Sequence, residues 1–330
     1  MNPTADTVLI LTHGADHFVI ERVAAALERR GARAARFDTE RFPVEARLAA
    51  RFGYGDGAHT LRCGELALDA ERVRAVWARK LWTPRFPDSL DARLRDGCAR
   101  ESRAALTGWL AALAGARWVN ALGATAAAED KLRQLRLAAE LGLRVPRTLV
   151  TNDPDEVRAF RAEVGPLVTK MLTPLSVSMG RSELFVHTSL VRDEDLADLD
   201  GLRFSPMVFQ EHVEKRVELR VACVGTRCLA GAIDASRSEQ GQVDWRRARP
   251  DEVRWTAGEV PTSIASSLGE LLARLGLAYG AADLIQTPAG EHVFLELNPS
   301  GEWGMLERDL ELPISEALAD ELLRTGGERP

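Results

Sequence analysis

The sequence predicts a mixed α/β (α+β) protein in which an amino-terminal α/β lobe precedes two α+β lobes. Strand-like and helix-like segments alternate over the first 120 residues, strand pairs and single helices make up the rest, and no segment is repeated. The chain has 330 residues, 45% of them hydrophobic and 28% charged, which is enough for more than one buried core. We therefore expect domains at residues 1–120, 121–212 and 213–330.

The amino-terminal lobe opens with a β-α-β pattern. An apolar strand starts at Val8, and hydrophobic residues with helical spacing follow over 18–30, where Gly31 ends the helix. A short strand is expected at Ala34–Phe37. The other elements expected in this lobe are strands over 59–68, 73–82 and 116–120 and a long amphipathic helix over 89–115.

The central lobe begins with a helix over 125–142, for which Thr125 is the expected N-cap and Gly142 the stop. The elements expected after it are a strand over 145–152, a helix over 153–164, and strands over 166–172, 182–188 and 207–213. A small, polar loop over 173–181 separates two of these strands.

The last lobe contains two strand pairs. Strands over 217–224 and 227–235 are joined by Gly225 and Thr226, and strands over 281–287 and 292–298 by a turn at 288–290. A helix over 263–276 separates the pairs, and a terminal helix ends the fold.

Composition excludes several classes of protein. The formal net charge of −6 provides no general basic surface for duplex nucleic acid. The N-terminus lacks a basic segment followed by a long apolar one, and no apolar run approaches the roughly 20 residues that span a membrane. We expect a cytoplasmic protein without a nucleic-acid or membrane partner. Four scattered cysteines favour reduced, structural thiols over a zinc site.

Three oxygen-bearing side chains, those of Asp283, Glu296 and Asn298, indicate a metal site. Glu296 and Asn298 are two apart on one expected strand and leave the same face, whereas Leu295 and Leu297 fill the other. A hairpin would place Asp283 beside them. Carboxylate and amide oxygens suit Mg²⁺ bound together with nucleotide phosphates. The alternative is the solvent-facing side of an antiparallel sheet.

Lysine is scarce, because only four of the 43 basic residues are lysine. Lys170 ends an apolar strand, where its ammonium group can neutralise a phosphate. Lys131 stands near the start of its helix and can do the same, with a solvated helix face as the alternative.

The strand end Gln210–Val213 offers polar groups and backbone that can read the edge of a purine. Glu218 and Arg220 share one face of the next strand. The acid can accept hydrogen bonds from ribose hydroxyls, and the arginine can hold a carboxylate or a transferring phosphoryl group. The alternative is a surface ion pair.

The order of these motifs resembles that of the ATP-grasp superfamily. The order is a lysine on a helix, a lysine on a strand, a Gln-Glu-x-Val segment, a strand with acid-x-Arg, an Asp and a Glu-x-Asn pair. More specifically, the chain is similar to the ATP-grasp ribosomal-peptide maturases, the graspetide (microviridin-type) synthetases. The segments that carry this likeness are WVNALGATAAAEDKLRQLRLAAELGLRVPRTLVTNDP, KMLTP, FQEHVEKRVELRV, DWR, ELNPSGEW and, in the first lobe, VWARKLWTPRFP. The resemblance covers nearly the whole chain and implies an ATP-grasp fold whose two α+β lobes clasp ATP.

The resemblance also implies a role for each matching residue. Lys131 and Lys170 would contact the ATP phosphates, Gln210, Glu211 and Val213 the adenine, and Glu218 the ribose. Asp283, Glu296 and Asn298 would hold Mg²⁺, and residues 173–181 would form a mobile loop over the phosphates.

The implied enzyme is an ADP-forming ligase that phosphorylates an Asp or Glu side chain of a ribosomal precursor peptide. A Ser or Thr hydroxyl or a Lys amine then attacks the acyl phosphate and closes a macrocyclic ester or amide. Arg220 is the first choice for binding the carboxylate, followed by Arg246 and Arg237. The leader of the precursor would bind the acidic residues Asp193, Glu194, Asp195 and Asp198, for which a solvated helix face is the alternative. Relatives suggest a homodimer.

Two other functions are compatible with the same fold. One is an ATP-grasp ligase that adds amino acids to a peptide or protein, and the other is a nucleotide-binding regulator without turnover. The intact set of lysines, acids and Arg220 argues against the regulator. A Rossmann oxidoreductase is disfavoured because LTHGADHF lacks the G-x-G-x-x-G fingerprint.

Overall fold

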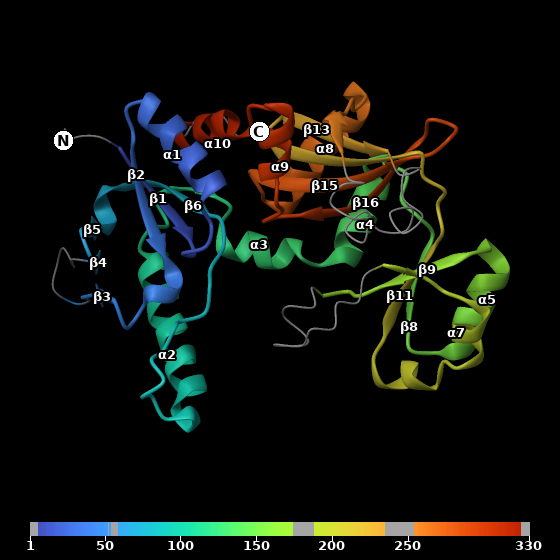
Figure 1. The fold of residues 1–330 in the computed structure, drawn as a ribbon, viewed down its shortest axis with the longest axis horizontal. Helices are drawn as coiled ribbons and strands as arrows, with labels where there is room; N and C mark the ends of the chain where they lie inside the picture. The colour runs from blue at the N-terminus through green and yellow to red at the C-terminus, as the bar shows by residue number, and fades with distance from the viewer. Residues whose placement is uncertain (1–5, 52, 54–58, 174–187, 235–253, 325–330) are drawn as a thin grey trace. The chain divides into compact units, whose positions relative to one another are not determined.

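The computed structural model describes residues 6–51, 53, 59–173, 188–234 and 254–324. The chain forms two compact units (Figure 1). Unit 1 comprises residues 1–125, 276–279 and 313–330, and unit 2 comprises residues 126–275 and 280–312. Unit 1 is therefore assembled from both ends of the chain. The division of the rest at about residue 212 stays a prediction.

Unit 1 is built on a four-stranded parallel sheet in the order β2-β1-β6-β7. The strands are β1 (Thr7–Thr12), β2 (Arg33–Asp38), β6 (Val73–Ala78) and β7 (Arg117–Val119). Helices α1 (Phe18–Arg29) and α10 (Ile314–Leu323) lie side by side, and α2 (Ala92–Ala111) packs into the same core cluster as β1 (Figure 1). Every residue of β1 is buried, as expected for a parallel strand that is covered on both faces. The predicted β-α-β opening is confirmed.

A second, three-stranded sheet in unit 1 joins β3 (Ala46–Ala49), β4 (Thr60–Cys63) and β5 (Leu66–Asp69). The prediction of a single strand over 59–68 was wrong, because the chain reverses at Gly64. This residue has φ +57°, a backbone conformation that glycine adopts without a steric penalty.

The first sheet of unit 2 has the strand order β10-β9-β11-β8. Its elements are β8 (Thr148–Thr151), α5 (Pro154–Val164), β9 (Leu167–Lys170), β10 (Ser189–Leu190), α7 (Asp193–Ala197), the 3-10 helix η3 (Asp200–Phe204) and β11 (Met207–Glu211). Val157, Leu167 and Phe209 are central to its core. The strand expected over 182–188 lies, except for Thr188, outside the described residues.

The second sheet of unit 2 has the order β14-β13-β12-β15-β16, and the pairs β12–β13, β13–β14 and β15–β16 are antiparallel. Its strands are β12 (Val217–Val224), β13 (Arg227–Asp234), β14 (Trp255–Ala257), β15 (Tyr279–Gln286) and β16 (His292–Asn298), accompanied by α8 (Thr262–Leu275) and α9 (Gly304–Leu310). Both predicted strand pairs are present, while β14 was not predicted.

The helix predicted over 125–142 is two helices, α3 (Leu122–Ala128) and α4 (Lys131–Glu140). Thr125 lies inside α3 and is not the N-cap. Instead, Asp130 caps α4 through its Oδ1, which accepts hydrogen bonds from the amides of Leu132 and Arg133 at 3.0 Å each. The cap makes Lys131 the first residue of α4. Gly142, with φ +78°, follows the helix as predicted.

None of the helices in the described part of the chain is both long and apolar enough to cross a membrane.

Candidate active site

A pocket in unit 2 gathers most of the residues that the sequence singles out. It encloses about 700 Å³ of space, part of it open to solvent. Its lining residues are Pro146, Val168, Lys170, Thr188, Gln210, Glu211, His212, Val213, Lys215, Glu218, Asp283, Ile285, Leu295 and Glu296. Both sheets of unit 2 contribute to it.

Two acids face each other across neighbouring strands of this pocket. Asp283 on β15 and Glu296 on β16 are direct register partners, so the expected hairpin does bring them together. Between Asp283 and Leu284 the register shifts, and β16 carries one extra residue, Leu295. The bulge breaks the alternation of side chains along β16. The expectation that Leu295 lies on the face opposite Glu296 was therefore wrong, since both residues line the pocket.

Lys131 and Glu296 form an ion pair, with about a fifth of each side chain exposed. The pair is held by Gln134, which is 2% exposed and lies one turn further along α4. The Nε2 of Gln134 donates to the carbonyl oxygen of Leu297 at 2.7 Å, and its Oε1 accepts from the Leu297 amide at 2.9 Å. Its Nε2 also donates to the carbonyl oxygen of Ala128. One buried amide thus connects the helix of Lys131 to the strand of Glu296.

Arg220 on β12 is 5% exposed and held from two sides. Its Nη1 donates to Asp283 Oδ1 at 2.8 Å, while Nε and Nη2 donate to the carbonyl oxygen of Glu302 at 3.1 and 3.0 Å. The Oε1 of Glu302 in turn accepts from the amides of Trp303 and Gly304 at 3.2 and 3.1 Å, next to the start of α9. Glu302 therefore fixes the loop that supports Arg220.

The end of β11 provides the groups expected to face a purine. Gln210 is 3% exposed and donates through Nε2 to Thr148 Oγ1 at 2.9 Å, while Glu211 Oε1 accepts from the Arg147 amide at 3.2 Å. Burial lowers the pKa of His212, and the ammonium group of Lys215 lowers it further. The lowered pKa favours the neutral imidazole at pH 7, which carries one donor and one acceptor.

Sequence reasoning missed Lys215 as a site residue. Its side chain is 4% exposed, lines the pocket and forms an ion pair with Glu218. Lysine scarcity was the available signal, because three of the four lysines of the chain lie in the pocket or on an acid that lines it. Lys215 lies in a loop, and a loop has no periodic pattern from which the orientation of a side chain can be predicted.

Five of the residues predicted to bind ATP, Mg²⁺ or the reacting carboxylate do not line the described pocket. Two of them, Lys131 and Arg220, pair with the lining acids Glu296 and Asp283. Arg237 and Arg246 lie outside the described residues. Asn298 is exposed at the end of β16, two residues beyond Glu296, and its Oδ1 accepts from the Ser300 amide at 3.1 Å.

The chemistry of the donor set fits Mg²⁺ bound with a nucleotide. Among the described residues no three or more His, Cys, Asp or Glu side chains cluster as a closed metal site. Mg²⁺ commonly takes only one or two carboxylates and completes its octahedron with water and phosphate oxygens. The facing acids Asp283 and Glu296 meet this requirement. Each is also paired with a basic residue, so a bound cation would compete with Arg220 and Lys131.

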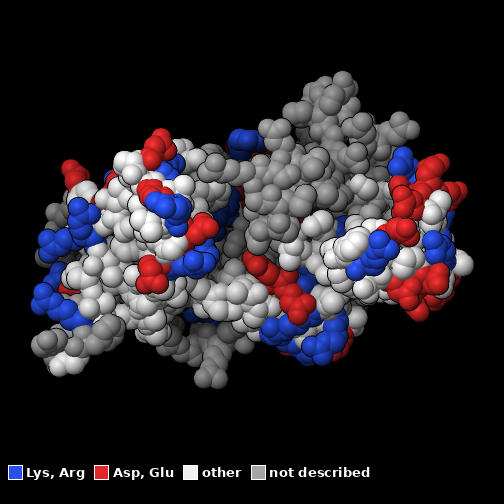
Figure 2. Space-filling view, turned by 90° about the horizontal axis from the view of Figure 1, so that it is seen from below, with Lys and Arg blue, Asp and Glu red and all other residues white. Residues whose placement is uncertain are grey.

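Helix α7 places the acidic run on the surface. Asp193 and Glu194 have side chains that are 91% and 79% exposed. Asp195 binds Arg192 with both carboxylate oxygens, which lowers the pKa of Asp195 to about 2. Asp198 follows the helix as its C-cap. Carboxylates and arginines interleave over α5 and α7 at this end of unit 2 (Figure 2).

The loop after β1 in unit 1 does not offer a phosphate site. The amide of Gly14, which would face a phosphate in a dinucleotide-binding fold, donates to Glu40 Oε1 at 2.7 Å. A carboxylate of the protein itself therefore occupies this anion position.

Solved structures similar to this chain include two macrocyclases and a RiPP-associated ATP-grasp ligase. Macrocyclase MdnC from Microcystis aeruginosa, bound with precursor peptide MdnA, is 36% identical with a TM-score of 0.85 over 96% of this chain and 99% of that one. Macrocyclase MdnB from the same organism is 42% identical with a TM-score of 0.79 over the same shares. A RiPP-associated ATP-grasp ligase of Chryseobacterium gregarium, in complex with ADP and a leader and core peptide, is 32% identical with a TM-score of 0.90, over 96% of each chain.

Sequence comparison adds two findings. Residues 7–126 match the family described as the MvdD pre-ATP grasp domain. A probable alpha-L-glutamate ligase from Vibrio vulnificus is 27% identical over 187 residues, which are 55% of this chain. The match spans only 59% of the length of that curated relative.

Proposed function

Because the chain belongs to the family of ATP-grasp macrocyclases that act on ribosomal precursor peptides, we propose that it closes rings in such a peptide through an acyl phosphate. The family membership and fold agree with the resemblance found in the sequence. ATP and Mg²⁺ are the cofactors of the reaction. The ring-closing chemistry, the site residues and the dimer are the proposal.

The reaction has two steps. A side-chain carboxylate oxygen of Asp or Glu attacks the γ-phosphorus of ATP, which forms an acyl phosphate and releases ADP. A Ser or Thr hydroxyl, or a Lys amine, then attacks the acyl carbon, loses its proton and expels phosphate. Each ring therefore removes one water from the peptide. Such phosphoryl transfer needs positioning and charge stabilisation and no covalent protein nucleophile.

The residues of the pocket fit these steps. Mg²⁺ would be held by Asp283 and Glu296, with Asn298 beside them, and when bound it neutralises phosphate charge. Lys131 and Lys170 supply ammonium groups for the phosphates.

At the other end of the pocket, Gln210, Glu211 and Val213 face the purine and Glu218 the ribose. Arg220 would bind the reacting carboxylate through its guanidinium group, which Asp283 and Glu302 hold in position. Arg246 and Arg237 remain candidates for the same role.

The observation that carries the proposal is the convergence of Lys170, Glu218, Asp283 and Glu296 in one pocket. The test is to incubate the protein with ATP, Mg²⁺ and a precursor peptide encoded beside it. Mass spectrometry should show the loss of one water per ring, together with ADP release. Asp283→Asn should abolish both. An unchanged peptide mass in the presence of ADP release would contradict ring closure.

A second candidate is a ligase that adds amino acids to a peptide, which the probable alpha-L-glutamate ligases favour by sequence similarity. The same experiment separates the two. Adding a free amino acid would raise the peptide mass by one residue, whereas ring closure lowers it.

The leader site and the assembly belong to the same proposal. We place the leader of the precursor on the acidic run Asp193, Glu194, Asp195 and Asp198, and we propose a homodimer in the cytoplasm. Asp198→Lys should weaken leader-peptide binding while α7 stays folded, because Asp198 lies just after the helix. Unchanged leader affinity would contradict this site.

Sedimentation at several concentrations would test the dimer.

A further inference from the structure

We propose that Lys215 is a positioning residue for nucleotide recognition, which orients the carboxylate of Glu218 toward the ribose hydroxyls. The inference rests on the proposed function only in that the nucleotide binds in this pocket. No role for Lys215 follows from the family resemblance.

The first support is the burial of this ion pair. Lys215 lies in the loop between β11 and β12, and Glu218 is the second residue of β12. Their side chains are 4% and 12% exposed, and Lys215 Nζ lies 2.5 Å from Glu218 Oε2. An ammonium group with so little access to water is rarely found without a charged partner, because its desolvation costs several kcal/mol. Lys215 and Glu218 therefore hold each other in place.

The second support is the division of charges in the pocket. Glu296 is paired with Lys131, Asp283 with Arg220, and Glu211 Oε1 accepts from the Arg147 amide. Lys215 forms its described ion pair with Glu218, which also lines the pocket. Lys215 is thus associated with the ribose end of the site and not with the metal end.

The third support is the choice of residue. In a chain that uses arginine for 39 of its 43 basic residues, a lysine beside the pocket indicates a need for a compact cation. An ammonium group pairs with one carboxylate oxygen without the two-pronged contact that a guanidinium makes. A carboxylate has about four acceptor positions, so pairing at Oε2 restrains its rotation and leaves capacity for hydroxyl donors.

Loss of the ammonium group should therefore change selectivity for the sugar. Without Lys215 the Glu218 carboxylate is no longer restrained, and its hydrogen bonds to the ribose weaken. The readout is the ratio of dissociation constants between ADP and its 2′-deoxy and 3′-deoxy analogues. General destabilisation of the pocket would weaken all three nucleotides and leave this ratio unchanged.

The experiment uses the full-length protein, Mg²⁺ and isothermal titration with the three nucleotides. The original protein should prefer ADP over at least one deoxy analogue by about tenfold or more, the value of a hydrogen bond to a charged group. Lys215→Met should lose most of this preference. Combining it with Glu218→Gln should add little further loss, since both changes remove the same interaction.

Arg216→Met is the matched control, because it removes one positive charge at the next residue. Arg216 is hydrogen-bonded to the Gln286 side chain and does not line the pocket, so the ADP preference should be kept. If Lys215→Met does not fold, Lys215→Arg provides the test, since it keeps the charge and changes the pairing geometry; it should reduce the ratio.

An unchanged ratio in the folded Lys215 variant, or no preference for ADP in the original protein, would overturn the inference. Because binding is measured without peptide, a failure to form rings leaves this result intact. A protein that binds no adenine nucleotide would refute both proposals.

Discussion

At Gly301 the backbone passes so close to Arg220 that no side chain fits. A Cβ at this position would lie 2.5 Å from the Cβ of Ala281 and 2.7 Å from Arg220 Nη2. These distances are far below van der Waals contact, and one of the two neighbours is backbone-fixed. Gly301 thus allows the loop after β16 to support the guanidinium group that we assign to the substrate carboxylate.

Gly301→Ala should displace Arg220 and lower ring formation by about a hundredfold, because a shift of about 1 Å in a positioning group has effects of that size. Overpacking should also reduce the free energy of unfolding by about 1–3 kcal/mol. The rate of ring closure and denaturant unfolding measure the two effects.

Gly108→Ala is the control, since a Cβ there meets no atom within 4 Å and the residue lies inside α2. It should stabilise the protein by up to about 1 kcal/mol and leave activity unchanged. Full activity in Gly301→Ala would show that Arg220 tolerates displacement.

Gln134 acts at the edge of a sheet, where β16 is the outermost strand within the described part of the chain. Its amide takes the place of a strand neighbour for Leu297. Gln134→Leu should leave buried donors and acceptors without partners and destabilise the protein by about 2 kcal/mol or more. It should also raise the KM for ATP, because Lys131 and Glu296 lose their common support.

Unfolding curves and ATP kinetics test the Gln134 variant. Arg136→Leu on the exposed face of the same helix should alter neither by much. An unchanged KM in a destabilised Gln134→Leu protein would restrict Gln134 to a structural role.

The predictability of the site from sequence differed from residue to residue. The spacing of two on a strand and the hairpin pattern predicted the meeting of Glu296 and Asp283, since β-periodicity is local. Leu295 was misplaced because a bulge depends on how two strands pair. Lys215 and Gln134 were missed because their partners are set by loop and tertiary geometry, which no local pattern encodes.

At the scale of elements, apolar periodicity located most strands of both units and the helices α1, α5 and α8, but it missed β3, β10 and β14. The errors fall where short polar signals compete with periodicity. The break between α3 and α4 depends on Asp130, whose side chain caps α4. The helical spacing of residues in the sequence continues through Asp130 and therefore gives no sign of the break. The reversal at Gly64 is a similar case, because glycine inside a strand pattern also fits a continuous strand.

The short helix α7 allows a prediction about pH. Arg192 donates two side-chain hydrogen bonds and one backbone hydrogen bond to Asp195. They lower the pKa of Asp195 to about 2, against an ordinary value near 3.8. The interaction is therefore fully present above the ordinary value and is lost as the pH falls through about 2. A carboxyl titration of Asp195 by NMR should have its midpoint near 2.

Arg192→Gln should return the Asp195 midpoint toward the ordinary range. Asp309 is a comparison within the same chain, because Arg308 lowers its pKa in the same way and the Arg192 variant should not affect it. A midpoint for Asp195 that is the same in both proteins would contradict the pairing.

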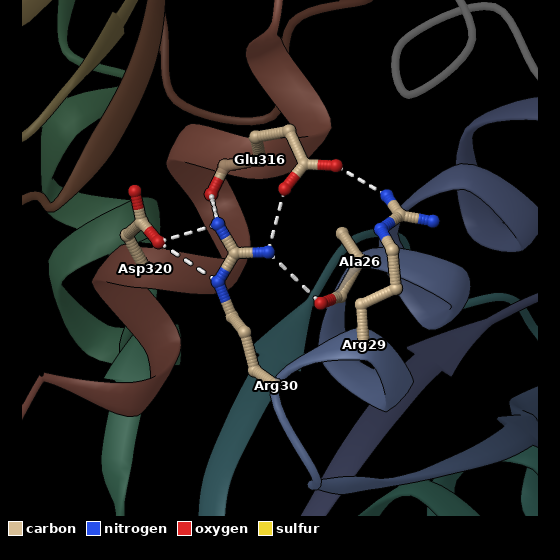
Figure 3. Close-up of polar contacts among 5 residues, drawn as sticks. All are labelled: Ala26, Arg29, Arg30, Glu316 and Asp320. Atoms are coloured by element: carbon tan, nitrogen blue, oxygen red, sulfur yellow. Dashed lines mark hydrogen bonds and ion pairs between the residues drawn. The ribbon is translucent and has the colours of Figure 1, made fainter.

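At the scale of the whole molecule, unit 1 is closed by the last helix of the chain. Helix α10 packs beside α1, with Ile314, Leu318 and Leu322 almost completely buried. Arg30 donates to Glu316 and Asp320 and to the Ala26 carbonyl, and Arg29 also pairs with Glu316 (Figure 3). The sequence predicted a terminal helix but not its place, because contacts nearly 290 residues apart leave no local signal.

The ion pairs of α10 with α1 and the buried apolar face of α10 should differ strongly in their contribution to stability. The arginines lower the pKa of Glu316, so its contribution is present above the ordinary pKa of a glutamate and is lost as the pH falls through the lowered value. The pairs are a quarter to more than half exposed, and water screens them. Glu316→Gln should therefore destabilise unit 1 by less than about 1 kcal/mol, an effect that salt reduces further.

Leu318→Ala should cost about 2–5 kcal/mol, because it removes a fully buried side chain and leaves a cavity. Hydrogen exchange of the amides in β1 and β6 reports this loss within unit 1, and amides of β12 in unit 2 serve as the internal reference. If Glu316→Gln increased exchange in β1 as much as Leu318→Ala does, the ion pairs and not the apolar face would hold α10 in place. We expect the apolar face to dominate at both low and high salt.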